Sequence, residues 1–165
     1  SVNISGRQFQ QRDLIGTVLS ALEKGDLEPR CLKLEITESV MMRDPKASLE
    51  AMTVFRGHRI HLVIDDFGTG YSSLSYLKRF PVDTLKVDKS FVDGLGKDPE
   101  STEIVKAVIS MAQSLGMRVT AEGIETREQM ELLRSLGCDQ GQGYFLSRPL
   151  PAQTAEDLLM KNPRW

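Results

Sequence analysis

Short strand-like runs, most of them with apolar residues at alternate positions, alternate along this chain with longer stretches of helical periodicity. Runs of the first kind cover residues 1–5, 31–37, 61–65, 83–88 and 117–122, and a sixth lies near residues 142–146. Successive residues of a strand point to opposite faces of a sheet, so such runs predict strands. Strands that alternate with helices along a chain predict βα units and a parallel sheet.

Helices are predicted between the strands, and capping residues mark several of their ends. The first spans residues 9–24, a short one spans residues 73–79, and a long amphipathic one spans residues 99–115. Asp44 followed by Pro45 predicts a helix start, and Thr126 with Gln129 forms a capping-box sequence. Gly116 and Gly137 are expected to end the helices before them, and a last helix follows Pro151. We therefore expect one α/β domain.

The polar positions of the first five strands follow a common rule. One face of each strand is apolar, as in Leu34 and Ile36 or Leu85 and Val87. The opposite face holds one acid, amide or amine near the carboxyl end, and these residues are Asn3, Glu35, Asp65, Lys86 and Glu122. Parallel strands that are covered on both faces are usually apolar throughout. The polar face therefore requires an explanation.

Three architectures compete to explain the polar face. An antiparallel sheet with one solvated face would alternate in this way, but helical segments separate every pair of strands. An open doubly wound sheet ranks second, because no Gly-x-Gly-x-x-Gly phosphate turn is present. The favoured interpretation is a TIM-type (β/α)8 barrel, in which polar side chains gather at the carboxyl ends of the strands, where such enzymes keep their active sites.

Composition and charge narrow the class of protein. The 165 residues fit one domain, and a formal net charge of −2 gives no basic surface for a nucleic acid polymer. No apolar run is long enough for a membrane helix, and Cys31 and Cys138 form no zinc motif. We expect a cytoplasmic protein, with a membrane-tethered parent protein left open.

The polar residues suggest a site for hard metal ions. Carboxylate and amide oxygens are the ligands that Mg²⁺ or Mn²⁺ prefers. Asp65 and Asp66 are neighbours, so we expect the strand to end between them and the Phe67–Gly70 turn to let both converge. Two metal ions could then support a phosphoryl transfer, with Lys86 holding the attacking water or a phosphate oxygen and Glu122 binding a metal or accepting a proton.

Each of these residues also has a purely structural interpretation. A strand-end aspartate often caps a turn. Lys86 could form an ion pair with Asp88 on the same face, and Glu38, Asp88 and Glu125 could be ordinary surface acids. An enolase-like Mg²⁺ barrel with Lys86 as its base is a further alternative. What favours a functional site is that polar groups occur together, one in each of five strands.

Six sequence blocks resemble the EAL-domain phosphodiesterases, bacterial enzymes that convert cyclic di-GMP to linear pGpG. The blocks are SVNIS, LEITES, IDDFGTGYSSL, LKVDKSFV, TAEGIET and QGYFLSRP, in the order of the family and almost from end to end of the chain. The resemblance implies a modified TIM barrel with two Mg²⁺ or Mn²⁺ ions. It implies that Asn3, Glu35 and Asp65 hold one ion, that Asp65, Asp66 and Glu122 hold the other, and that Lys86 lies at the attacking water.

The resemblance also implies supporting residues and partners. Glu38 would support the loop after Asp66, Asp88 would act as a supporting residue, and Glu125 and Gln142 would lie on the substrate side. The expected partners are cyclic di-GMP, a second copy of the chain that contacts the loop at residues 67–74, and an upstream sensor or GGDEF-type domain.

One departure from the family concerns the Glu-Ala-Leu strand, whose glutamate is a metal ligand and which precedes SVNIS in the family. We therefore expect residues 1–165 to be a partial domain with about six of the eight βα units, without the first two strands. The isolated chain could then be inactive although its parent is a phosphodiesterase. The alternatives are a receptor that binds cyclic di-GMP without cutting it, and an inert fragment.

Overall fold

The structure is a parallel six-stranded sheet whose strands follow one another in the order of the sequence. This computed structural model describes residues 1–68 and 74–161. All five strand pairs are parallel. The strands are β1 (Val2–Ile4), β2 (Lys33–Thr37), β3 (His61–Phe67), β4 (Thr84–Val87), β5 (Arg118–Ala121) and β6 (Gln140–Gly141).

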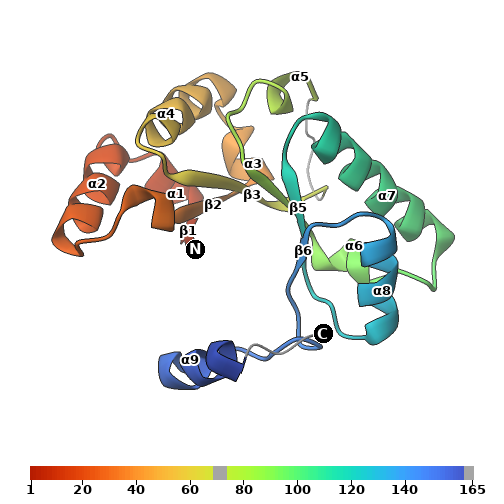
Figure 1. Cartoon of the computed structure of the whole chain (residues 1–165). Coiled ribbons are helices and arrows are strands. Elements are labelled where there is room, and N and C mark those ends of the chain that lie inside the picture. Colours follow the sequence, from red (N-terminus) through yellow and green to blue (C-terminus); the bar gives the residue numbers. More distant parts are fainter. Residues whose placement is uncertain (69–73, 162–165) are drawn as a thin grey trace.

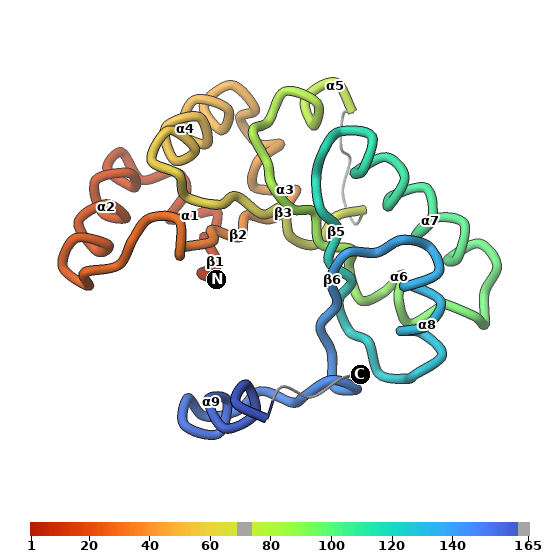
Figure 2. The backbone as a smooth tube through the Cα atoms, viewed as in Figure 1, coloured from red at the N-terminus to blue at the C-terminus, as the bar shows by residue number. Residues whose placement is uncertain are grey.

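Helices cover the outer side of this curved sheet (Figure 1). The helical elements of the described residues are α1 (Gly6–Phe9), α2 (Leu14–Lys24), a 3-10 turn at Pro29–Cys31, α3 (Glu38–Met41), α4 (Pro45–Gly57), α5 (Leu74–Leu77), α6 (Lys89–Asp93), α7 (Pro99–Ser114), α8 (Arg127–Ser135) and α9 (Ala152–Lys161). The tube in Figure 2 shows α9 standing apart from the other helices, at the end of the segment that follows β6. In the part of the chain that the structure describes, no helix is both long and apolar enough to cross a membrane.

The strand order decides between the three predicted architectures. Parallel pairing throughout excludes the antiparallel sheet. A doubly wound sheet reverses its strand order at a switch point, whereas here each strand pairs with the next one in the sequence. Sequential parallel strands with helices on the outside are the arrangement of a (β/α)8 barrel, so the prediction of a barrel-type α/β fold is confirmed.

The apolar face of the sheet forms the core with the helices that cover it. Strand residues at alternating positions are at most 1% exposed: Leu34, Ile36, Leu62, Ile64, Leu85, Val87, Val119 and Ala121. Met52 and Phe55 of α4 and Val105 and Ile109 of α7 are equally buried. Each such side chain contributes about 1.5–3 kcal/mol on burial. Val2, by contrast, lies on the edge strand β1 and is 50% exposed.

Predicted helix ends agree with the structure where a capping residue marks them. The Asp44 side chain accepts a hydrogen bond from the Ala47 amide at the start of α4, and Thr126 and Gln129 form the complete capping box of α8. Gly116 follows α7 with a φ of +75°, a left-handed conformation that suits glycine.

Three predicted elements differ from the structure. The single helix over residues 9–24 is wrong, because a capping box between Ser5 and Gln8 starts α1 earlier and a separate helix α2 begins at Leu14. The short helix predicted over residues 73–79 is α5, Leu74–Leu77, and residue 73 lies outside the described residues.

The strand predicted near residues 142–146 is also wrong. The structure places β6 at Gln140–Gly141, and the chain then turns, since the amides of Leu146 and Ser147 both donate to the carbonyl of Gly143. The Phe145 amide donates to the Ile124 carbonyl, so this turn packs on the segment after β5.

Candidate metal and active site

The polar face of the sheet gathers its functional side chains at the carboxyl ends of the strands. Parallel register places Asn3 beside Glu35, and Thr37 of the same strand beside Asp65. Lys86 lies in β4, and Glu122 directly follows β5, with its amide donating to the Val87 carbonyl. The structure therefore brings together residues from five consecutive units, as the alternation along the strands predicts.

A β-bulge lets Asp65 and Asp66 serve the same site. Ile64 pairs with Leu85 and Phe67 pairs with Val87, so two residues of β3 oppose the single Lys86 of β4. Asp66 has a φ of +53°, a left-handed conformation that aspartate tolerates better than most residues. The expectation that the strand ends between the two aspartates is thus wrong, because β3 continues to Phe67 and the bulge supplies the change of direction.

Lys86 is the cation at the centre of the site. Its Nζ lies 2.7 Å from Oε2 of Glu35, 2.8 Å from Oδ1 of Asp65 and 2.6 Å from Oε1 of Glu122. All four side chains are at most 15% exposed. Burial by itself would lower the pKa of Lys86, but the contacts with Asp65, Glu122 and Glu35 outweigh it and raise the pKa above its usual value, so the amine stays charged. The alternative Lys86–Asp88 pair is replaced by these three contacts.

Asp65, Asp66 and Glu122 form a group with the geometry of a cation site. One carboxylate oxygen from each lies within 4.8 Å of the others. Burial raises the pKa of Glu122, and the charges of Asp65 and Asp66 add to this against the opposing effect of Lys86. Burial, followed by the charges of Asp65 and Asp88, raises the pKa of Asp66. The three carboxylates supply the hard oxygen donors that a divalent cation prefers.

The pKa of Glu35 is shifted in the opposite direction from those of Asp66 and Glu122. Burial alone would raise the pKa of Glu35. The hydrogen bond and the charge interaction with Lys86 lower the pKa by more than this, so that the net shift is downward. The carboxylate is therefore ionised at neutral pH and is available as an oxygen ligand. Asn3, its neighbour in β1, is exposed.

Two of the predicted supporting residues contact the site or the loop beside it. The Oε2 atom of Glu38 accepts a hydrogen bond of 2.9 Å from the Gly68 amide, and Glu38 itself is only 1% exposed. It therefore anchors the chain just after β3. Gln142 donates from Nε2 to Oε1 of Glu122 at 2.5 Å, which fixes the orientation of that carboxylate.

Asp88 and Glu125 occupy the rim of the site. The Asp88 side chain accepts from the Ser90 amide and caps α6. Glu125 forms an ion pair of 2.5 Å with Lys89. Further along the chain, the Arg148 guanidinium lies 4.9 Å from the ring centre of Tyr144. Sequence reasoning did not single out Lys89, because only the sheet order brings the end of β4 beside the segment after β5.

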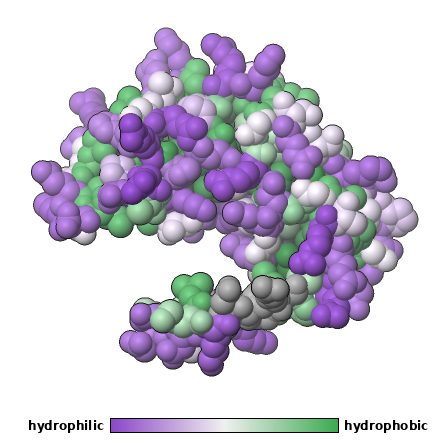
Figure 3. Space-filling model, viewed as in Figure 1, coloured by the Kyte–Doolittle hydropathy of each residue, from purple (hydrophilic) through white to green (hydrophobic). Residues whose placement is uncertain are grey.

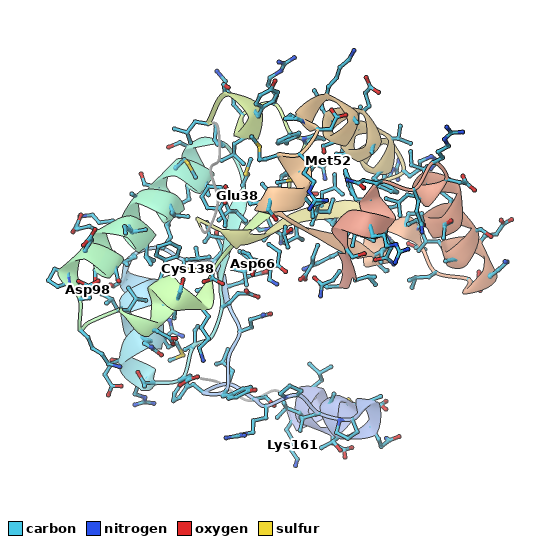
Figure 4. All side chains as sticks on the ribbon, turned by 180° about the vertical axis from the view of Figure 1, so that it is seen from behind. Glu38, Met52, Asp66, Asp98, Cys138 and Lys161 are labelled. Carbon is cyan, nitrogen blue, oxygen red and sulfur yellow. The ribbon has the colours of Figure 1, made fainter. Side chains whose placement is uncertain are left out.

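Figure 4 shows where the labelled residues lie in the molecule. Asp66 and Glu38 are in its central part, near the end of β3, whereas Asp98 and Lys161 lie at the periphery. Asp66 therefore lies near the middle of the curved sheet, with βα units on either side.

Comparisons with known proteins place this arrangement in a family. The sequence model of the EAL domain matches residues 1–149. MucR of Pseudomonas aeruginosa, a bifunctional diguanylate cyclase/cyclic di-GMP phosphodiesterase by name, is 44% identical over 153 residues, which cover 93% of this chain and 22% of that protein. The first two curated relatives are matched over 20% and 22% of their own length, so the chain spans about a fifth of each.

Solved structures agree with the sequence comparison. The PaMucR phosphodiesterase in its c-di-GMP complex matches with a TM-score of 0.91 and 44% identity, over 93% of this chain and 62% of that chain. Klebsiella pneumoniae BlrP1 in its manganese/cyclic di-GMP complex matches with a TM-score of 0.82 and 33% identity, over 90% of this chain and 38% of that chain. The match of the family model over almost the whole chain, together with these structures, shows that the chain belongs to the EAL domain family.

Proposed function

We propose that the domain containing this chain hydrolyses cyclic di-GMP to linear pGpG with the help of divalent cations. The observation that carries the proposal is the group of Asp65, Asp66 and Glu122, whose oxygens lie within 4.8 Å of one another beside the buried Lys86. The names of the EAL relatives and the cyclic di-GMP bound in the PaMucR structure support the choice of substrate.

Two Mg²⁺ or Mn²⁺ ions are the proposed cofactors. Asn3, Glu35 and Asp65 would hold one ion, and Asp65, Asp66 and Glu122 would hold the other, while the manganese in the BlrP1 complex supports a divalent metal. Such ions, when bound, activate water and neutralise the charge of a phosphodiester.

The residues of the chain itself supply positioning and proton transfer. Lys86 carries a fixed positive charge at the centre of the site, so it would hold the attacking water or a phosphate oxygen. Glu122 has a raised pKa, so it is a stronger base than an ordinary carboxylate and would accept a proton. Gln142 keeps Glu122 oriented, and Glu125 and Asp88 would act from the rim on the substrate side.

Partners and domain organisation are part of the proposal. An upstream sensor or GGDEF-type domain is proposed from relatives such as MucR. A homodimer through residues 67–74 is proposed as well, and residues 69–73 of that loop lie outside the described residues. A partial domain that lacks two of the eight strands is proposed too, and the match to only 62% of the PaMucR chain is consistent with a larger domain. The cytoplasm is the proposed location, since Cys31 and Cys138 are free thiols.

The test is turnover of cyclic di-GMP by the intact protein that carries this domain, in Mg²⁺ and in Mn²⁺, with pGpG separated as the product. Asp65→Asn and Glu122→Gln should each lower the rate by about 10²-fold or more, because each removes a charge that the reaction requires. Glu131→Gln is the control, since Glu131 is an exposed residue of α8 that pairs with Arg127 at 4.0 Å.

A binding titration in Ca²⁺ separates the alternatives. Binding without turnover would assign the protein to the non-catalytic receptors. Absence of both binding and turnover in the intact protein would contradict the proposal altogether.

A further inference from the structure

Lys86 makes an unusual number of ionic contacts for one side chain. Its ammonium group lies within 2.8 Å of carboxylates from three different places in the sheet, namely Glu35 in β2, Asp65 in β3 and Glu122 after β5. Lys86 itself is 6% exposed. In the metal-free protein its three hydrogens can each be donated to one of these acceptors.

The carboxylates around it need such a cation. Glu35, Asp65, Asp66 and Glu122 bring four negative charges into one partly buried space, where like charges repel and desolvation is costly. Removal of the only buried cation that contacts this cluster in the described part of the chain would leave these charges uncompensated.

The same lysine also competes with a metal ion. Asp65 and Glu122 belong both to the contacts of Lys86 and to the group of three that fits a divalent cation. A divalent cation that binds these three carboxylates attracts the same oxygens as Lys86 and repels its ammonium group. The affinity of the site for the cation is therefore reduced by the cost of weakening the ion pairs of Lys86.

We propose that Lys86 is the internal counter-ion of the carboxylate cluster in the metal-free protein, and that divalent cations bind in competition with its ion pairs. This role is separate from any contact of Lys86 with water or phosphate, and it rests on the proposed function only in naming the competing ligand. Lys86 thereby stabilises the sheet in the metal-free protein, and the same ion pairs lower the affinity for metal ions.

Lys89 provides a matched comparison on the same side of the molecule. It is three residues further along and forms one ion pair, with Glu125, in which both side chains are about half exposed. Glu125 is outside the group of three carboxylates. Lys89→Met therefore removes one positive charge near the site without removing the counter-ion of the cluster.

The experiment compares Lys86→Met, Lys86→Arg and Lys89→Met with the unsubstituted intact protein. Free Mn²⁺ is measured by electron paramagnetic resonance during a titration at pH 8, where protons compete least. Unfolding by urea is measured in EDTA. K86M should bind Mn²⁺ about tenfold more tightly, because the repulsion and the competing ion pairs are gone, and its metal-free form should unfold at a lower urea concentration.

The control variants fix the interpretation. K86R keeps the charge and should stay close to the unsubstituted protein in both measurements, and K89M should change the Mn²⁺ affinity less than twofold. If K86M does not fold, Lys86→Gln replaces it, since the amide preserves hydrogen bonding without the charge. Mn²⁺ binding that is unchanged or weaker in the folded neutral variant overturns the inference alone, whereas absence of Mn²⁺ binding by the unsubstituted protein overturns the proposed metal site as well.

Discussion

Glu122 and Asp66 are the residues at which proton binding competes with metal binding. Burial and neighbouring carboxylates raise the pKa of both groups, so each holds a proton at a higher pH than an isolated carboxylic acid does. Divalent cations require the deprotonated form. Protons and metal ions therefore compete at these two residues over a range that begins above the usual carboxyl pKa.

We expect the affinity for Mn²⁺ to fall as the pH is lowered from 8 to 5, with the decline starting above the range of an ordinary carboxylic acid. For the metal-free protein the sign follows from the same shift. A raised folded pKa means that ionised Glu122 costs stability above its unfolded pKa, and this cost is relieved as the pH falls through the folded pKa. Glu122→Gln should accordingly stabilise the metal-free protein at pH 8 and lose this advantage towards pH 4.

Urea unfolding in EDTA at several pH values measures the effect, with Glu131→Gln as the exposed control on α8. A stability difference between E122Q and the unsubstituted protein that grows as the pH falls would contradict the assigned direction.

The identity of the site residues could be predicted at this scale, but their geometry could not. Period-two alternation points to Glu35, Asp65, Lys86 and Glu122 because these residues share one strand face. The bulge at Asp66 breaks that period, and no local signal marks it, since the left-handed conformation of an aspartate depends on what the neighbouring strand presents. The ion pairs of Lys86 likewise depend on register between strands that are distant in the sequence.

Among the elements, the turn after β6 is held against the segment that carries Glu122 and Glu125. The Ile124 amide donates to the Gln142 carbonyl, and the Phe145 amide donates to the Ile124 carbonyl. A Cβ atom at Gly143 would lie 2.1 Å from the Ile124 carbonyl oxygen, and backbone cannot move aside as a flexible side chain can. Gly143 is therefore required by close approach of two backbones.

We expect Gly143→Ala to lower the free energy of unfolding by about 1–3 kcal/mol, the usual cost of forcing extra volume into a packed contact. Gly57→Ala is the matched control, because a Cβ atom at this last residue of α4 meets nothing within 4 Å. The control should be neutral or stabilising by up to about 1 kcal/mol. Urea unfolding of both variants decides the matter, and equal stability of the two would show that the contact with Ile124 is looser than the structure indicates.

Element boundaries were predictable where a side chain marks them. Asp44, Thr126 and Gly116 act through local hydrogen bonds or backbone conformation, so their signal is in the sequence itself. The error over residues 9–24 arose although a local signal exists, since Ser5 and Gln8 form the capping box that starts α1. The error over residues 142–146 has a distant cause, because the Phe145 amide donates to the Ile124 carbonyl where the chain turns.

At the scale of the whole molecule, α9 is the least integrated part of the chain. None of its residues is buried, and Leu159 and Met160 are 77% and 83% exposed. Figure 3 shows apolar atoms on the surface of this helix. The family model ends at residue 149, before α9 begins.

We expect limited digestion with thermolysin, a protease that cuts before apolar residues, to remove α9 first. Local segments with few buried contacts open at little cost in free energy, whereas cleavage in the sheet requires global unfolding. Mass spectrometry should show an early stable product that ends after residue 141 and contains all six strands. Early cleavage between residues 33 and 121 would instead show that the sheet is the weaker part.

The overall architecture followed from the alternation of strands and helices, and the strand order confirmed it. The sequence pattern could not reveal how far α9 stands from the sheet, because its amphipathic periodicity is that of a packed helix. The position of α9 depends on which part of a protein packs against its apolar side, and the periodicity of the helix does not specify that partner.

The strand order bears on how the protein is made. From β2 onward, each strand pairs with the one synthesised immediately before it, so it can pair as soon as it is made. Chains leave the ribosome at about 5–20 residues per second, and pairing between neighbours in sequence has the lowest closure cost. The sheet can therefore grow in the direction of translation, and a slow codon or a stalled ribosome would leave a shorter sheet whose existing strands are already correctly paired.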